Sequence, residues 1–235
     1  MKMQAKHHKV LKGIDVSHWQ GIIDWNGVKA DGVSFAYLKA TEGLNRVDPR
    51  FRENASGARW AGVYTGGYHF ARPDLNPTLD KAREEVLNFI DTLQKGFGAG
   101  NFGDIYPVLD LELPFPKKDK KLNTGRLLKW ASTFNNYFRK LTGKTLMIYT
   151  GVYFIREYDN FSFQNLGNPL AEMPLWIALY PRPEKIVEPE PPPAAGNWNR
   201  WTVWQYTSKG KVKGIEGDVD LNWAEPGLLK RIKHH

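Results

Sequence analysis

Four acidic residues lie in or at the ends of short apolar segments of this 235-residue chain. They are Asp15 in GIDVSHWQG, Asp110 and Glu112 in YPVLDLELP, and Asp220 in GDVDLNW. An ionised carboxylate is costly to bury without a partner, so packing alone does not account for four of them. Asp110 and Glu112 have the i,i+2 spacing that directs both side chains to one face of a strand, with Cα atoms about 6.5–7 Å apart. The leucines between and beside them would face the other way.

Two carboxyl groups in one cleft suit hydrolysis of a glycosidic bond. One is protonated and gives its proton to the leaving oxygen, and the other is ionised and stabilises positive charge at the anomeric carbon or orients a nucleophile. Repulsion and burial separate their pKa values and so assign the roles. Two alternatives stay open: a carboxylate that caps a loop or pairs with a surface Lys, and oxygen ligands for Mg²⁺ or Ca²⁺. Because the sequence has no EF-hand, H-x-x-x-H or H-E-x-x-H pattern, we expect no metal and no other cofactor.

Aromatic residues accompany these carboxylates near the ends of the predicted strands. The chain has 9 Trp, 10 Tyr and 12 Phe, and sugar rings stack on such faces. For each of these rings, core packing is the alternative to sugar binding. His18 and His69 are expected to be structural or to line the site, and Ser17 lacks the G-x-S-x-G surroundings of a nucleophile. The aromatic residues at or near strand ends are Tyr68, Tyr149, Trp176, Trp204 and Tyr206.

Short apolar runs that alternate with amphipathic stretches must position these groups. Helices are predicted after Asp48-Pro49, after Asn76-Pro77, and from a cap at Thr124 to Gly143. Strands are predicted over 13–19, 33–40, 63–70, 105–111, 146–150, 174–180, 201–207 and 219–222. Helices separate the first six strands, whereas the last two are nearly adjacent. The pattern predicts an α/β fold, a modified TIM-like (β/α) barrel with eight strands and a reduced helix count at the C-terminal end. Such barrels carry their chemistry at the C-terminal ends of the strands.

One catalytic domain is expected over 13–230, after a basic N-terminal extension over 1–12. Six prolines lie between positions 181 and 193. We interpret 181–199 as a Pro-rich surface loop within the domain, because the roughly 40 residues that follow are too few for a separate domain without cysteines. The closing Lys233-His234-His235 resembles the start of a purification tag, so 231–235 is treated as a tail.

Composition excludes several classes of protein. The chain has no Cys, which excludes a disulfide scaffold, a thiol nucleophile and any Cys-ligated metal site. Its formal net charge is +8, but the Lys and Arg are scattered, and a polyanionic cell wall suits that charge as well as nucleic acid does. We therefore expect no nucleic-acid partner. No apolar run is long enough to cross a membrane, and no signal-peptide core follows the basic N-terminus, so we expect no membrane insertion.

From about residue 13 to residue 223, the chain resembles glycoside hydrolase family 25. The resemblance is carried, in the family's order, by GIDVSHWQG, FAYLKATEG, YTGGYHFARP, PVLDLEL, LWIALY, WTVWQYTS and VDLNW. Lysozymes of this family cleave the β-1,4 bond between N-acetylmuramic acid and N-acetylglucosamine in peptidoglycan, and their barrel has fewer helices than the standard form. The resemblance implies the same activity here. We expect a monomer whose partner is the peptidoglycan glycan strand, located outside the cell or at the cell wall.

The same resemblance implies roles for individual residues. Glu112 is the general acid, Asp110 is its partner, and Asp15 and Asp220 are further active-site carboxylates. The expected reaction retains the anomeric configuration through attack by the substrate's own N-acetyl group, and a direct enzyme nucleophile is the competing scheme. The residues expected to bind the sugar are Tyr68, Tyr149, Trp176, Trp204 and Gln205.

Two segments look longer than the family minimum, the loop over 115–121 and the Pro-rich stretch over 181–193. Both follow predicted strand ends, so both could overhang the groove and alter which substrates fit. The alternative function is a catalytically silent peptidoglycan-binding protein that uses the same groove.

Overall fold

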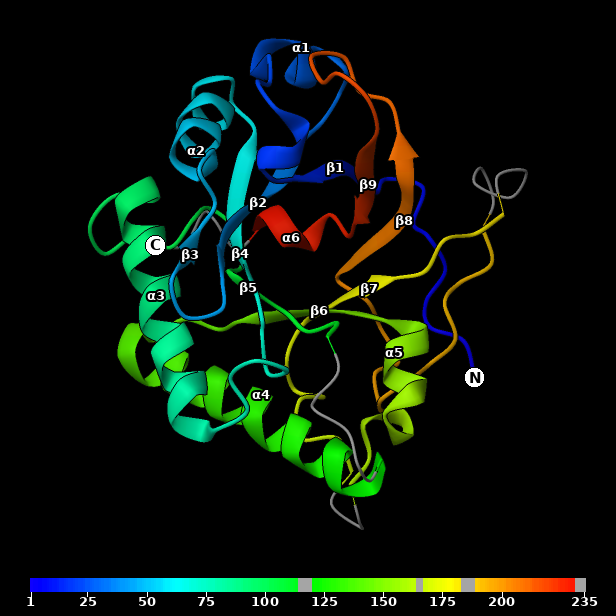
Figure 1. Ribbon diagram of the computed structural model, residues 1–235. Helices are drawn as coiled ribbons and strands as arrows, with labels where there is room; N and C mark the ends of the chain where they lie inside the picture. The colour runs from blue at the N-terminus through cyan, green and yellow to red at the C-terminus, as the bar shows by residue number, and fades with distance from the viewer. Residues whose placement is uncertain (114–119, 164–166, 183–188, 231–235) are drawn as a thin grey trace.

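The computed structural model describes residues 1–113, 120–163, 167–182 and 189–230, and its centre is a closed barrel (Figure 1). β1 pairs with both β2 and β9, which closes the sheet and confirms the predicted eight-stranded α/β barrel. A two-residue strand, β3 (Arg46–Val47), adds to the edge of β2. The barrel strands are β1 (Leu11–Val16), β2 (Phe35–Glu42), β4 (Tyr64–Phe70), β5 (Val108–Asp110), β6 (Met147–Gly151), β7 (Leu175–Ala178), β8 (Val203–Gly210) and β9 (Val219–Ala224).

The last strand of the barrel runs against the others. From β1 through β2, β4, β5, β6 and β7 to β8 each neighbouring pair is parallel, whereas β9 is antiparallel to β1 and to β8. The start of β9 therefore lies at the end of the barrel where the other strands finish. Asp220, near that start, is in register with Asp15 of β1. The reversed strand thus brings an early residue of its own to the end of the barrel expected to hold the chemistry.

Helices cover one side of the barrel more completely than the other (Figure 1). The helix after β4 packs on the one after β5, and the helix after β2 packs on β2 and β4. No helix lies between β7 and β8, or between β8 and β9, within the described residues, which confirms the reduced helix count at the C-terminal end. The helices are α1 (Trp25–Ala30), α2 (Phe51–Trp60), α3 (Leu79–Phe97), α4 (Lys120–Thr142), α5 (Val152–Glu157) and α6 (Gly227–Lys230), with 3-10 turns η1 (His18–Gln20) and η2 (Asp159–Phe161).

The three predicted helix starts are wrong. α2 follows Arg50, whose side chain makes no capping bond, and not Asp48, which accepts the His18 N–H at 3.0 Å. Thr124 lies inside α4 and its hydroxyl donates to the Asp159 carboxylate at 2.8 Å, so it is no cap. α3 follows Thr78, whose hydroxyl accepts the Lys81 N–H, and not Asn76. In each case the side chain expected to cap a helix has a tertiary hydrogen-bond partner, and local pattern alone does not reveal such a partner.

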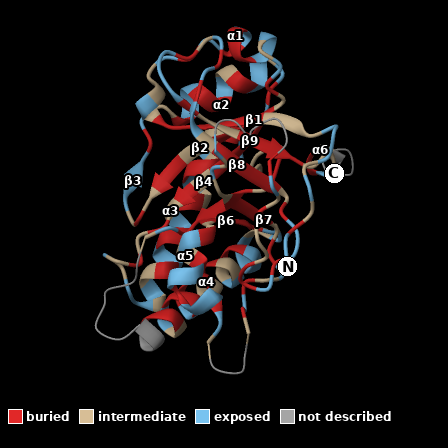
Figure 2. Cartoon of the chain, turned by 90° about the vertical axis from the view of Figure 1, so that its right-hand side faces the viewer, coloured by how far each residue is buried: buried red, intermediate tan, exposed pale blue. Residues whose placement is uncertain are grey.

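Alternation along the strands separates an inner apolar cluster from an outer one, and buried residues occupy both sides of the sheet (Figure 2). The close approach of the inner aromatics needs glycine: a Cβ added at Gly66 would come within 2.7 Å of the Tyr37 ring. Leu228 of α6 joins the inner cluster from the end where the parallel strands begin. The inner cluster includes Phe35, Tyr37, Val108, Met147, Trp176 and Val203. These side chains fill the end of the barrel where the parallel strands begin, so a site has room only at the end where those strands finish.

The first residues of the chain lie beside the segment that precedes β8 (Figure 1). The Met3 N–H donates to the Pro192 carbonyl at 2.7 Å, and Gln4 and Trp201 exchange three hydrogen bonds, two through the Gln4 side-chain amide and one to its backbone carbonyl. β1 begins at Leu11, inside the expected extension over 1–12. Residues 114–119 of the loop predicted over 115–121, residues 183–188 of the Pro-rich loop and the tail at 231–235 lie outside the described residues. Within the described chain, no helix is long and apolar enough to span a membrane.

Candidate active site

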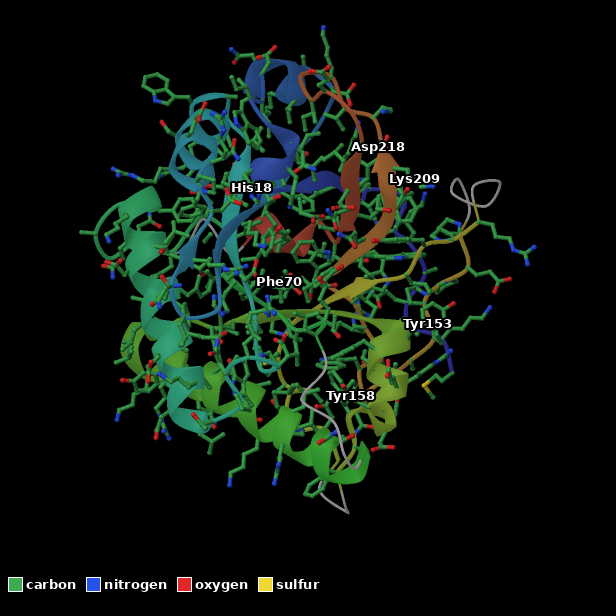
Figure 3. The ribbon with its side chains drawn as sticks, in the orientation of Figure 1. His18, Phe70, Tyr153, Tyr158, Lys209 and Asp218 are labelled. Carbon is green, nitrogen blue, oxygen red and sulfur yellow. The ribbon has the colours of Figure 1, made fainter. Side chains whose placement is uncertain are left out.

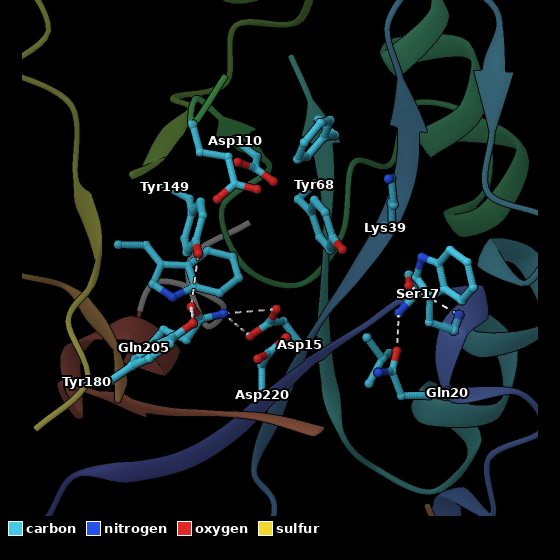
Figure 4. Close-up of a pocket in the computed structure, with 15 residues that line it drawn as sticks. Asp15, Ser17, Gln20, Lys39, Tyr68, Asp110, Tyr149, Tyr180, Gln205 and Asp220 are labelled. Carbon is cyan, nitrogen blue, oxygen red and sulfur yellow. Dashed lines mark hydrogen bonds between the residues drawn. The ribbon is translucent and has the colours of Figure 1, made fainter. Parts of the chain in front are cut away.

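A trough at the C-terminal end of the barrel brings the four predicted carboxylates together (Figure 4). Asp15 comes from β1, Asp110 from the end of β5, Glu112 from two residues beyond it, and Asp220 from β9. The cavity has a volume of about 320 Å³. Residues more than 200 positions apart in the chain, such as Asp15 and Asp220, therefore line one site.

The carboxylates of this trough differ in depth. Asp110 and Asp15 are buried, with 5% and 7% of their surface exposed, whereas Asp220 is half-buried and Glu112 is exposed. Val108 belongs to the inner cluster, and Leu109 and Leu111 belong to the outer one. The alternation expected for the Asp110–Glu112 segment is thus present, with both acids directed into the barrel mouth.

Asp15 is held by two amides. Gln205 Nε2 donates to its two oxygens at 3.0 and 3.2 Å, and Asn222 Nδ2 donates to Oδ2 at 2.7 Å. Burial, followed by the charge of Asp220, raises the pKa of Asp15 well above its ordinary value, although the two amides act in the opposite direction. Figure 4 shows Asp15 and Asp220 side by side on the floor of the trough.

Asp110 and Glu112 have few compensating partners. Asp110 Oδ1 is buried and has no hydrogen-bond partner among the described residues. Burial, followed by the charge of Glu112, raises the pKa of Asp110 well above its ordinary value. Burial, followed by the charge of Asp220, raises the pKa of Glu112. Both shifts favour the protonated form, which is the form a general acid needs.

Aromatic walls flank the acids and are tied to Gln205. The hydroxyls of Tyr149 and Tyr180 each donate to Gln205 Oε1 at 2.9 Å, which fixes the amide so that its Nε2 faces Asp15. Burial, followed by nearby carboxylate charges, raises the pKa of Tyr180 to about 12, so it remains a donor at neutral pH. Trp176 is 2% exposed, and its Nε1 donates to Asn222 Oδ1 at 2.8 Å. It lines the trough from below, and Tyr68 also lines it, as predicted.

Trp204 does not reach the trough, contrary to prediction. Its side chain is fully buried in the outer cluster, where the indole Nε1 donates to the Leu179 carbonyl at 2.7 Å and the ring packs edge-on against Trp223. Successive residues of a strand face opposite sides of a sheet, so Trp204 and Gln205 do not share a face. Gln205 is the one directed inward. Tyr206 also lies elsewhere, stacked on Trp223 at 3.7 Å.

Several residues of the trough were not predicted. Lys39 follows the inward-facing Tyr37 by two positions, so the spacing that identified the acids would also have identified it. The same spacing after Asp220 gives Asn222, which holds Asp15 without lining the trough. Tyr180 is the last residue of the predicted strand over 174–180 and comes two residues after Ala178. Trp19, with 81% of its surface exposed, lines the trough from η1. An exposed ring after a strand carries no periodic signal, which is why it was missed.

Ser17 and His18 have structural partners. The Ser17 hydroxyl accepts the Trp19 N–H, and the Ser17 backbone N–H donates to Gln20 Oε1. These two hydrogen bonds cap η1. The ring Nδ1 of His18 lies 2.8 Å from Asp48 Oδ2. Figure 3 shows His18 on the blue N-terminal segment near the barrel mouth, whereas Lys209 and Asp218 lie out on the β8–β9 hairpin. No group of three or more His, Asp and Glu among the described residues could hold a metal ion.

The barrel and its paired carboxylates define a glycoside hydrolase, because a closed barrel with acids at the strand ends and aromatic walls has the parts that glycosidic cleavage requires. The sequence model of glycosyl hydrolases family 25 matches residues 14–215, and the chain belongs to this family.

Known proteins of similar sequence and structure agree with this assignment. Lysozyme M1 of Streptomyces globisporus is 36% identical over 214 residues, which are 90% of this chain and 67% of that protein. The spore cortex lytic enzyme SleM of Clostridium perfringens superposes with a TM-score of 0.84 at 39% identity, covering 94% of this chain and 69% of SleM. The bacterial lysozyme of Streptomyces coelicolor superposes with a TM-score of 0.74 at 32% identity, covering 95% of this chain and 97% of that lysozyme.

Proposed function

We propose that this protein is a muramidase, which hydrolyses the β-1,4 bond between N-acetylmuramic acid and N-acetylglucosamine in peptidoglycan. The single observation that carries the proposal is the pairing of Asp110 and Glu112 in one open trough with aromatic walls. The relatives named lysozyme and spore cortex lytic enzyme support the choice of substrate. The positive net charge of +8 suits an anionic wall polymer.

Glu112 is assigned the role of general acid. It is the most exposed of the four carboxylates, so it can reach the glycosidic oxygen of a polymer that lies across the mouth. Its raised pKa, caused by burial of the carboxyl group and then by Asp220, supports a proton that is still present when substrate binds. After the leaving sugar departs, the same carboxylate takes a proton from the incoming water.

Asp110 is assigned the role of orienting the substrate's N-acetyl group. Its buried Oδ1 has no partner within the described chain, and an acetamido N–H is a donor of the right kind for it. The acetamido oxygen then attacks the anomeric carbon as Glu112 protonates the leaving oxygen, and the resulting oxazolinium is opened by water with net retention. Asp15 and Asp220 add negative charge that favours the cationic transition state.

The remaining features of the proposal concern binding and location. We assign sugar contacts to Tyr68, Tyr149 and Gln205, with Trp176 beneath them. Residues 13–230 are proposed to act as one catalytic domain, as a monomer, outside the cell or at the cell wall.

Mass analysis of muropeptides released from purified peptidoglycan tests this function. The expected products carry muramic acid at the reducing end, and Glu112→Gln releases none above background. Products with glucosamine at the reducing end would make the protein a glucosaminidase. Sedimentation of the protein with peptidoglycan, without release of reducing ends, would instead show a silent binding protein.

A further inference from the structure

Lys39 places a cation among the carboxylates of the trough. It follows Tyr37 of the inner cluster by two positions on β2, so both side chains face the barrel interior. Its side chain is 16% exposed and lines the trough. Among the described residues that line this trough, Lys39 is the one Lys, Arg or His. Burial of a charged Lys side chain is costly unless it has partners, so its position needs a reason.

The ammonium group is fixed from two sides. Lys39 Nζ lies 2.9 Å from Glu42 Oε2 and 4.7 Å from the centre of the Phe70 ring. Phe70 in turn is in register with Asp110 across the β4–β5 pair. The cation is therefore held over a residue of β4 that neighbours Asp110. Figure 4 shows Lys39 across the trough from Asp110, with Tyr68 between them.

The ion pair with Glu42 does not neutralise Lys39. Glu42 Oε1 also contacts Arg46 at 3.2 Å and Arg72 at 2.8 Å, and Arg72 contacts Asp74 at 2.8 Å. Three cations thus share two carboxylates, which leaves one positive charge in the cluster. Although burial opposes it, hydrogen bonds from Lys39 and Arg72 hold the pKa of Glu42 below its ordinary value, so Glu42 stays ionised at neutral pH.

We propose that Lys39 is a positioning residue of the hydrolase site, which keeps the Asp110–Glu112 pair in the singly protonated form that acid catalysis uses. Without a cation, two adjacent carboxyl groups in a poorly solvated trough both retain protons, and Asp110 does not accept the substrate's N–H as a carboxylate. With the cation, ionisation is favoured at both groups, so the pair holds one proton and not two. In the proposed mechanism that proton is on Glu112. This inference rests on the proposed muramidase function.

The electrostatic surroundings support this role. Burial, then the neighbouring carboxylate, raises the pKa of Asp110, and the charge of Lys39 opposes that rise; Lys39 opposes the rise at Glu112 in the same way. The other titratable groups that line the trough are Asp15 on β1, Tyr68 on β4, Tyr149 on β6, Tyr180 after β7 and Asp220 on β9. None of these five supplies positive charge. Outside the lining, His18 lies against Asp48, and Arg46, Arg72 and Asp74 surround Glu42.

The test compares three variants, Lys39→Met, Lys39→Arg and Arg46→Gln. Met keeps the length and apolar stem of Lys without its charge, and Arg keeps the charge. Arg46 pairs with the same Glu42 but is 75% exposed and lies outside the trough, so it is the matched control. Two quantities are measured against pH: kcat/KM on soluble peptidoglycan fragments, and the carboxyl ¹³C shifts of Asp110 and Glu112 in the enzyme without substrate.

Lys39→Met is expected to move both limbs of the kcat/KM profile to higher pH and to lower activity on the acidic limb by roughly tenfold. The ¹³C titrations move in the same direction. Lys39→Arg and Arg46→Gln keep the wild-type profile and titrations. Unmoved ¹³C titrations in Lys39→Met would overturn the inference, as would a raised KM with an unchanged profile, since Lys39 would then contact substrate. Wild-type protein that titrates as expected but releases no reducing ends would overturn the proposed function alone.

Discussion

The two faces of β4 bury carboxylates in opposite ways. Tyr68 and Phe70 face the trough, where Asp110 is 5% exposed. His69, between them, faces the helix layer, where Glu85 of α3 is fully buried. One short strand thus separates two regions with similar burial and similar side chains.

Every oxygen of Glu85 has a partner. Oε2 lies 2.8 Å from His69 Nε2 and accepts the Arg72 N–H at 3.2 Å, and Oε1 accepts the Asn76 amide at 2.7 Å. The other ring nitrogen of His69 lies 2.7 Å from Thr41 Oγ1. This satisfied network joins β2, β4 and α3 and holds the loop that carries Arg72.

Asp110 lacks such a set of partners, since its Oδ1 has none in the described structure, and burial followed by the charge of Glu112 raises its pKa. The difference shows how the chain divides its buried charges. A buried carboxylate whose oxygens all have protein partners links secondary-structure elements to each other. A buried carboxylate without such partners is available to a substrate, but it lowers the stability of the fold.

Glu112→Gln is expected to have the largest effect on activity. The amide cannot donate an acid proton, so release of reducing ends from peptidoglycan falls at least about a thousandfold while the thermal unfolding midpoint changes little. The exposed Glu84→Gln on α3 is the control and retains wild-type activity. Activity retained by Glu112→Gln would remove this residue from the acid role and weaken the contrast between the two faces.

Glu85→Ala is expected to have the largest effect on stability. It leaves the His69 ring and the Asn76 amide without their buried acceptor, which costs about 3 kcal/mol of unfolding free energy. Urea unfolding at neutral pH measures the change. Glu84→Ala, at the neighbouring exposed position, should stay within about 0.5 kcal/mol of wild type. A loss for Glu85→Ala no larger than that control would mean that the network does not fasten the strand.

Sequence alone predicted the barrel and the meeting of the four acids. Apolar runs separated by amphipathic stretches define the strand and helix sequence, and a parallel barrel necessarily collects the ends of its strands. Asp220 joined the site by another route, because its strand is reversed and its early residues lie at that end. The prediction of Asp220 came from its place in an apolar strand run, and the reversal of that strand was not part of it.

Trp204 and Lys39 show what local patterns leave out. The choice of Trp204 as a sugar-binding residue ignored the alternation that sends it to the opposite face from Gln205. Lys39 obeys that alternation, but Arg72, which shares the carboxylate of Glu42 with it, reaches that carboxylate only after β2 and the loop beyond β4 come together. The composition of the motifs shows neither the face of a strand nor its tertiary partners.

Asp110→Asn is expected to stabilise the fold by about 1 kcal/mol near neutral pH, although it abolishes most of the activity. Because burial, and then Glu112, raises the folded-state pKa of Asp110, the folded protein binds this proton more tightly than the unfolded chain does. The unfolding free energy of the wild type therefore falls as pH rises from the ordinary pKa of Asp through the raised one. The uncharged Asn does not titrate, so the variant does not lose this stability. The unfolding free energy of Asp110→Asn minus that of the wild type should therefore be larger at about pH 8 than at about pH 4. A variant less stable than wild type at the higher pH would show that the Asp110 carboxylate is as well satisfied as that of Glu85, and the distinction between the two faces of β4 would fail.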